Sequence, residues 1–230
     1  AGYRIGHGVL VDSLLNDGLV DSFSREHMAL LVERLAREFE LSRAEQDAFA
    51  LRSHRRCVEA VGAGRYAAEL APMTDLDRDE HPRADASLGR LAALKPAFDP
   101  NGAVTAGNAS GINDGAAMLL LADGETTRAR GWRPLARLCA WSAIGCEPAR
   151  MGLGPVFALR RLCEATGARM EEFDTVEINE AFAAQTLLCA RELGIAEERL
   201  NPDGGAIALG HPLGASGARL AAHLAHRIAA

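Results

Sequence analysis

The pattern of apolar residues changes near Pro100, and this change restricts the possible folds more than any other feature of the chain. Upstream of Pro100, helical spacing predicts helices over 24–40, from Ser42 to about Val61, and over 87–94. Downstream, short apolar runs alternate with helical patterns: the expected strands are 116–122, 135–144 and 173–178, and the expected helices are 155–166, 181–193 and 215–228. Such alternation is typical of layered α/β domains. We therefore expect a mostly helical region followed by part of an α/β core.

The overall charge and hydropathy narrow the classes of function. The net charge is −6, whereas nonspecific nucleic-acid binding needs a broad basic surface, so no nucleic-acid partner is expected. No apolar run reaches the roughly 18–20 residues that cross a bilayer, and no signal-peptide pattern opens the chain. We therefore expect a cytoplasmic enzyme without a membrane partner. A small anionic ligand remains compatible, because a few local arginines suffice to bind it.

The cysteines and histidines give no sign of a metal site. The five cysteines form no CxxC pair and show no metal-finger spacing, and their odd number suggests free thiols. None lies in a small-residue turn that would activate a thiolate, so we expect none of them to be a nucleophile. His223 and His226 lack a third ligand nearby, and an exposed helix face explains them better than a metal.

Two glycine-rich segments are unusual for plain scaffolding. The run 105–115 is made of small and turn-forming residues, which let backbone approach a ligand, although a tight loop explains it equally well. In 201–219, His211 stands between glycine and proline in a loop that leads into a helix. Fixed backbone on both sides suits an imidazole that acts as a base or hydrogen-bond donor. A phosphate loop is the rival interpretation, but the glycine spacing matches no phosphate-binding motif.

A third segment, 176–185, places Asn179 and Glu180 at the carboxyl end of an expected strand, just before a helix. Ligands bind at this position in α/β folds. Asn179 could equally serve as the cap of the helix.

These segments resemble signature motifs of the thiolase family. The motifs are Val104-Thr-Ala-Gly-Asn-Ala-Ser-Gly111, Asn179-Glu-Ala-Phe-Ala183 and Gly204-Gly-Ala-Ile-Ala-Leu-Gly-His-Pro-Leu-Gly-Ala-Ser-Gly-Ala-Arg219, in the order of the family. Leu41–Ala50 and Met151–Pro155 match further family segments, so the resemblance covers nearly the whole chain. It implies the thiolase fold, an α/β fold of five layers in the full protein. This chain would hold a mostly helical, CoA-binding loop domain (1–98) and most of the C-terminal half (99–230), which would be incomplete.

The resemblance also implies an activity and two catalytic residues. A cysteine would attack acetyl-CoA or a 3-ketoacyl-CoA, and the acyl group would pass to a second CoA or to an acetyl-CoA carbanion. His211 would activate that cysteine and, with a water held by Asn179, form an oxyanion hole. This arrangement suits the chemistry, because a thiol needs an adjacent base and an oxyanion needs preorganised donors.

The remaining residues that the resemblance assigns bind the substrate. Coenzyme A or acyl-CoA would be a substrate, and no tightly bound cofactor or metal is implied. Ser110 would bond the pantetheine arm, and Arg83 would lie at the adenine end. The tunnel would be lined by Leu94, Phe98, Ala106, Met28, Met151 and Phe182, with His27 beside it; core packing is the competing explanation for Phe98, Met151 and Phe182.

The chain departs from the family pattern in ways that leave alternatives open. Family members carry the nucleophilic cysteine upstream of the first residue here and a second catalytic cysteine downstream of the last, so we expect this chain alone to be an inactive excerpt. The pocket segment His27–Glu33 and Arg90 also differ from most relatives. The alternative is a non-catalytic acyl-CoA-binding relative. Gly2–Val11 resembles a loop that joins dimers into tetramers, so we expect a homodimer or homotetramer.

Overall fold

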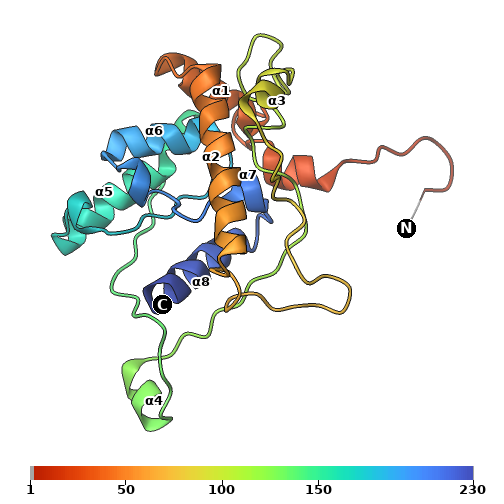
Figure 1. Cartoon of the computed structure of the whole chain (residues 1–230). Helices are drawn as coiled ribbons and strands as arrows, with labels where there is room; N and C mark the ends of the chain where they lie inside the picture. The colour runs from red at the N-terminus through yellow and green to blue at the C-terminus, as the bar shows by residue number, and fades with distance from the viewer. Residues whose placement is uncertain (1–2, 230) are drawn as a thin grey trace.

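The computed structural model describes residues 3–229 and is mainly helical (Figure 1). Its α-helices are α1 (Met28–Glu38), α2 (Arg43–Gly62), α3 (Leu88–Ala92), α4 (Gly124–Ala129), α5 (Gly154–Thr166), α6 (Ala183–Leu193), α7 (Ala206–Leu209) and α8 (Ser216–Ala229). Short turns of other helix types are η1 (Leu15–Leu19), η2 (Pro148–Leu153), η3 (Met170–Glu172) and η4 (Glu197–Arg199). The helical predictions from the sequence are confirmed, with small differences at their ends.

Helix α2 forms the centre of the molecule and contacts α3, α6 and α7 (Figure 1). It begins with the predicted capping box: Ser42 Oγ accepts from the Glu45 amide at 3.2 Å, and the Glu45 carboxylate accepts from the Ser42 amide at 2.8 Å. These two bonds satisfy donors that a helix start otherwise leaves free. The local sequence therefore fixes where the central helix begins.

One apolar core joins α1, α2 and α6 and reaches the segments on either side of them. Its buried members include Val32, Leu35, Phe49, Leu51, Leu188 and Leu193. Burying a side chain of this size contributes about 1.5–3 kcal/mol to stability. Because α1 and α2 belong to the N-terminal part of the chain and α6 to the C-terminal part, this core fixes the two parts against each other.

The predicted strands are not formed as a sheet within residues 3–229. The expectations for 116–122 and 135–144 are wrong: neither segment is in a strand. The expected strand 173–178 makes only one parallel bridge, between Val176 and Leu200. A strand is stabilised by the hydrogen bonds of its neighbours, and the described residues supply no neighbour for these runs.

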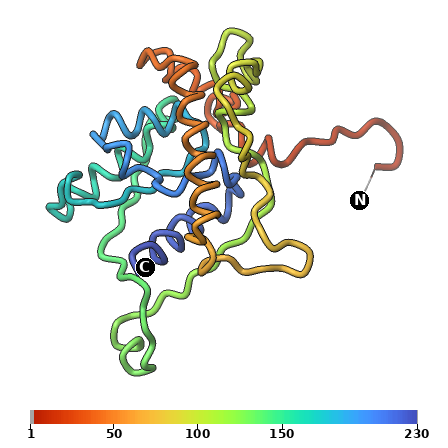
Figure 2. The backbone as a smooth tube through the Cα atoms, in the orientation of Figure 1, coloured from red at the N-terminus to blue at the C-terminus, as the bar shows by residue number. Residues whose placement is uncertain are grey.

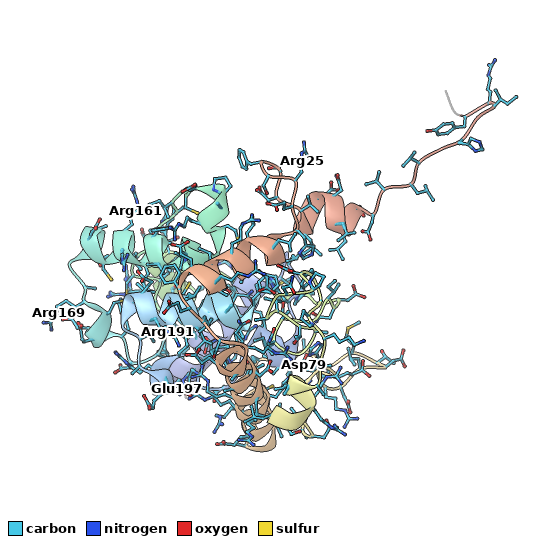
Figure 3. The ribbon with its side chains drawn as sticks, turned by 90° about the horizontal axis from the view of Figure 1, so that it is seen from above. Arg25, Asp79, Arg161, Arg169, Arg191 and Glu197 are labelled. Carbon is cyan, nitrogen blue, oxygen red and sulfur yellow. The ribbon has the colours of Figure 1, made fainter. Side chains whose placement is uncertain are left out.

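Two stretches run away from the helical body as long connections (Figures 1 and 2). One includes α4 and carries exposed apolar side chains, such as Met118, which is 92% exposed, and Trp141. The other is the N-terminal segment, where Leu10 is fully exposed. Figure 3 shows this segment leaving the body on the side opposite Arg161 and Arg169.

The N-terminal segment includes most of the sequence that resembles an oligomerisation loop. Gly2 lies outside the described residues, and 3–11 are exposed. Among the residues that the structure describes, no helix has the length and apolar character that a membrane span requires.

Helix α8 is attached to the body by a buried charged cluster. His223, expected on an exposed face, is only 2% exposed, so that expectation is wrong. Its Nδ1 lies 2.8 Å from Glu69 Oε1 and its Nε2 lies 3.3 Å from Asp203 Oδ2, while its ring stacks on Tyr66. An imidazole can be buried in this way because both ring nitrogens meet carboxylates.

Candidate active site

The structure brings Asn179 and His211 into direct contact, although 32 positions separate them. The Asn179 Nδ2 lies 3.2 Å from the His211 Nε2. Asn179 lies just before α6, and His211 lies between α7 and α8. The two residues that the family resemblance assigns to one oxyanion hole therefore lie side by side.

The loop that contains Ser110 lies against both of these segments. The Ser110 amide donates to the Ala181 carbonyl at 3.0 Å, and the His211 amide donates to the Gly111 carbonyl at 3.1 Å. The Ser110 hydroxyl also donates to the Ala181 carbonyl at 3.2 Å. Three sequence segments that were singled out separately therefore form one site.

The environment of His211 favours a neutral imidazole. Burial, with a smaller contribution from the positive charge of Arg219, lowers the pKa of His211 below its usual 6.5. The His211 Nδ1 lies 2.6 Å from the Ser216 hydroxyl at the start of α8. A neutral imidazole with its proton on one nitrogen can act as a base at the other nitrogen, here Nε2 beside Asn179 if the proton is on Nδ1.

Glycine is required immediately before His211. Gly210 has φ of +92°, in the region that side chains rarely adopt, and a Cβ there would overlap Asn113. An open pocket of about 450 Å³ lies next to this turn, lined by 113–117 and 212–215. His211 itself does not line this pocket, which begins at the next residue, Pro212.

Glu180 anchors the segment that carries Asn179. Its carboxylate is 1% exposed and accepts from Ser53 Oγ at 2.6 Å, Asn201 Nδ2 at 2.8 Å and the Ile207 amide at 3.1 Å. These donors come from α2, the 201 turn and α7. Because one carboxylate joins them, the Asn179 segment and the His211 segment are held in a fixed relation.

A second buried carboxylate holds the start of the Ser110 loop. Glu33 of α1 accepts from the Ala103 amide at 2.9 Å and the Val104 amide at 2.7 Å. Asn108 then closes the loop: its Oδ1 accepts from the Thr105 amide at 2.8 Å. The sequence analysis did not single out Glu33, Asn108 or Ser216, and only their places inside or beside the quoted motifs could have indicated them.

The residues expected to line a pantetheine tunnel fall into two groups. His27 and Phe98 stack with ring centroids 4.5 Å apart, and Phe98 remains partly exposed. Leu94 lies against Gly107, next to the exposed Ala106. Leu94 and Phe98 thus come from the segment just before the 104–110 loop, and Ala106 belongs to the loop.

Met28, Met151 and Phe182 form the second group and contribute to the core. The two methionines are half-buried and pack against the main apolar cluster, and Phe182 is a buried member of it. The backbone of Phe182 pairs with Ala109 in an isolated bridge. These side chains therefore support the loop from the core. They leave less surface accessible to a ligand than Phe98 does.

The segment that carries Arg83 packs against the candidate site. The guanidinium is exposed, while the Arg83 amide donates to His54 Nδ1 at 3.2 Å. Two residues earlier, His81 Nδ1 donates to the Ala208 carbonyl at 3.0 Å, and its ring lies against Gly111. The segment therefore reaches both the Ser110 loop and the turn before His211.

Comparison with known proteins decides the family. The family description "Thiolase, N-terminal domain" matches residues 1–125, and "Thiolase, C-terminal domain" matches residues 132–230. An acetyl-CoA acetyltransferase from Pseudomonas aeruginosa is 47% identical over 236 residues, which covers 99% of this chain. The chain belongs to the thiolase family.

Solved thiolase structures confirm the predicted thiolase fold. The acetyl-CoA acetyltransferase of Bacillus anthracis superposes with a TM-score of 0.93 at 41% identity, over 99% of this chain and 59% of that chain. Human mitochondrial 3-ketoacyl-CoA thiolase in complex with CoA gives 0.90 at 37% identity, over 99% of this chain and 58% of that chain. This thiolase chain spans about 60% of the length of the Pseudomonas relative.

Proposed function

We propose that the whole protein is an acyl-CoA acyltransferase of the thiolase type, which condenses acetyl-CoA or cleaves a 3-ketoacyl-CoA. The observation that supports this most directly is the contact of 3.2 Å between Asn179 and His211, beside the Ser110 loop. The relatives include an acetyl-CoA acetyltransferase and a 3-ketoacyl-CoA thiolase, and the solved structure of that thiolase is a complex with CoA. CoA and acyl-CoA are then substrates, and no tightly bound cofactor is part of the proposal.

In this proposal His211 is the base and an oxyanion donor in turn. The neutral imidazole takes a proton from a cysteine thiol at Nε2, and the thiolate attacks the thioester carbonyl. The protonated Nε2 then donates to the developing oxyanion, together with a water held by Asn179. The buried Oδ1 of Asn179 has no partner within the described residues, which suits an amide that holds a water.

The nucleophile of this proposal is a cysteine outside the 230 residues. Cys57 and Cys189 are fully buried, and burial raises the pKa of Cys57 to about 12 and of Cys189 to about 11. Both thiols are therefore poor thiolates at neutral pH. Cys139 and Cys146 are exposed in the connection between α4 and η2. Cys163 is half-buried within α5 and lies in no small-residue turn. By this argument the isolated chain lacks thiolase activity.

The loop domain, 1–98, supplies one wall of the proposed CoA groove. Ser110 contacts the pantetheine arm, and Phe98 with its stacked partner His27 forms an apolar rim. Leu94 and Ala106 continue that rim, and the exposed Arg83 offers positive charge to the phosphates at the adenine end. Met28, Met151 and Phe182 support the tunnel from the core. The C-terminal half, 99–230, then carries the chemistry.

The remaining parts of the proposal concern assembly and location. The exposed apolar side chains of 3–11 fit a homodimer or homotetramer in which this segment is covered. A cytoplasmic location fits the five cysteines, none of which is paired.

Thiolysis of acetoacetyl-CoA by the whole protein tests the proposal. The expected result is turnover that falls at least a thousandfold in His211→Ala, because that change removes a base and a donor together. His226→Ala is the matched control, because His226 lies in α8 outside the candidate site, and this variant should retain activity. If the whole protein binds acetyl-CoA but shows no turnover, the protein is a non-catalytic acyl-CoA-binding relative and the proposal is wrong.

A further inference from the structure

The side chain of Ser216 connects the imidazole of His211 to the first turn of α8. Ser216 is 5% exposed, its Oγ lies 2.6 Å from the His211 Nδ1, and its hydroxyl donates to the Pro212 carbonyl at 3.1 Å. On the other side of the ring, the Asn179 Nδ2 lies 3.2 Å from Nε2. The imidazole is thus held between two side chains from different segments.

With the Asn179 amide in the orientation of this structure, the donors and acceptors of these contacts agree with only one neutral tautomer. An amide nitrogen can only donate, so the His211 Nε2 next to Asn179 Nδ2 must accept and carries no proton. A neutral imidazole has one N–H, which must then be at Nδ1. Ser216 Oγ accepts that proton, and its single hydroxyl hydrogen is used at the Pro212 carbonyl.

A purely structural role for Ser216 explains only part of this geometry. A serine in the first turn of a helix often bonds to a carbonyl four residues earlier, as Ser216 does with Pro212. That role does not require an imidazole at 2.6 Å on the same oxygen. Because the hydroxyl hydrogen is directed to Pro212, the oxygen is left oriented as an acceptor toward His211.

We infer that Ser216 is a positioning residue for His211, which holds the imidazole in the Nδ1–H tautomer so that Nε2 carries no proton and can accept the thiol proton in place of the Asn179 hydrogen bond. This inference rests on the proposed function for the meaning of that proton transfer. Ser216 itself touches no reacting atom, and it acts only through the ring of His211. In the opposite amide orientation of Asn179, Nε2 would be protonated and Ser216 would donate to Nδ1.

The tautomer can be measured without any turnover. Two-bond ¹H–¹⁵N correlation spectra of the protein with labelled histidine, assigned with His211→Ala, report which ring nitrogen is protonated at neutral pH. The expected result is a single Nδ1–H form for His211. An Nε2–H form, or an average of the two tautomers, would overturn the inference even if the thiolase activity is confirmed.

Variants of Ser216 separate positioning from a structural role. In the whole protein Ser216→Ala should lower kcat by about tenfold, the effect of one ordinary hydrogen bond, and leave the KM for CoA unchanged. In the spectra it should also produce a mixture of His211 tautomers, and Ser216→Thr, which keeps the hydroxyl, should restore both values. Ser142→Ala is the matched control, since Ser142 donates to the Ala158 carbonyl at 2.7 Å. If Ser216→Ala leaves the tautomer and kcat unchanged, the inference is wrong.

Discussion

Ser53 in α2 donates a hydrogen bond of 2.6 Å to Glu180, 127 positions later in the chain, and both side chains are buried. The same Ser53 hydroxyl oxygen accepts from the Gly205 amide at 3.1 Å. One serine of the N-terminal region thus connects the segment that carries Asn179 with the segment that leads to His211. The geometry of the candidate site depends on this buried network as well as on the residues that face the pocket.

The network predicts a large effect of Glu180→Gln on stability. Glu180 accepts three hydrogen bonds, so an amide nitrogen in either orientation would place a donor against at least one other donor. Leaving a buried group unsatisfied costs about 1–3 kcal/mol. The free energy of unfolding, measured in urea, should fall by that amount. Glu171→Gln, at an exposed position, is the control and should change it by less than about 0.5 kcal/mol.

Asn179→Ala should slow the chemical step of the whole protein. Losing one oxyanion donor typically costs about 10²–10³-fold in rate. Since Asn179 meets His211 and not the proposed CoA groove, the affinity for CoA should stay within about twofold of the unmodified protein. Single-turnover rates and CoA titration measure the two quantities separately. A variant that loses CoA affinity but keeps its rate would contradict this placement.

The buried cluster around α8 contributes stability that should be lost as the pH rises. Burial raises the pKa of Glu177 to about 7, against an ordinary value of 4.5. Burial lowers the pKa of His223, but the hydrogen bond to Glu69 and the nearby charges of Glu69, Glu177 and Asp203 outweigh it, so the pKa is raised above 6.5. At these two groups the folded state therefore binds more protons than the unfolded state between about pH 4.5 and the raised pKa of His223, and their contribution to stability declines across that window.

Unfolding in urea at pH 5 and pH 8 measures this decline. Glu177→Gln removes one titrating group and one anionic neighbour of His223, so the difference between the two pH values should shrink by on the order of 1–3 kcal/mol. Glu171→Gln again serves as the exposed control and should leave the difference unchanged. A difference between pH 5 and pH 8 that is the same in Glu177→Gln as in the unmodified chain would contradict the assignment.

The cysteines should divide into fast and slow classes toward an aromatic disulfide reagent. Cys139 and Cys146 are exposed, whereas Cys57 and Cys189 are fully buried with pKa values raised to about 12 and about 11. Replacing both exposed cysteines with serine should abolish the fast phase in the native protein, and the half-buried Cys163 should react more slowly than they do. A fast phase that survives in that double variant and disappears with Cys57→Ser would contradict the buried assignment.

Gly204 and Gly167 allow the loss of stability caused by an added Cβ to be compared in crowded and open surroundings. Both have positive φ, +87° and +74°. A Cβ at Gly204 would lie 2.6 Å from the Ser53 carbonyl oxygen and 2.8 Å from Cys57, whereas a Cβ at Gly167 meets nothing within 4 Å. Gly167→Ala should cost roughly 1 kcal/mol, the usual strain of the left-handed conformation. Gly204→Ala should cost at least 2 kcal/mol more, as urea unfolding would show.

The sequence predicted the helices well because their signals are local. Ser42 and Glu45 are three residues apart, and they alone determine how α2 begins. The strands 116–122 and 135–144 were predicted wrongly because an apolar run does not specify the neighbour that a strand needs. His223 was misjudged for a similar reason, since its partners Glu69 and Asp203 come from other segments of the chain.

The candidate site was predictable to the extent that its residues lie in motifs. The contact between Asn179 and His211 followed from the family resemblance, and no spacing rule could have supplied it. The buried supports Glu33 and Ser53 were not predictable, because they have ordinary surroundings in the sequence, and the motif that contains Ser216 did not show its role. Their importance appears only when the fold places each one against a backbone amide or a ring nitrogen.

Helix α8 is held at two points, by Ser216 against His211 and by His223 against Glu69 and Asp203. Seven residues separate these points, which corresponds to about 10 Å along an α-helix. A rigid rod of that length converts a tilt of about 5° at the His223 end into a movement of roughly 1 Å at Ser216. Since a displacement of about 1 Å can cost on the order of a hundredfold in rate, ionic groups that never touch a substrate would set how accurately the imidazole is aimed.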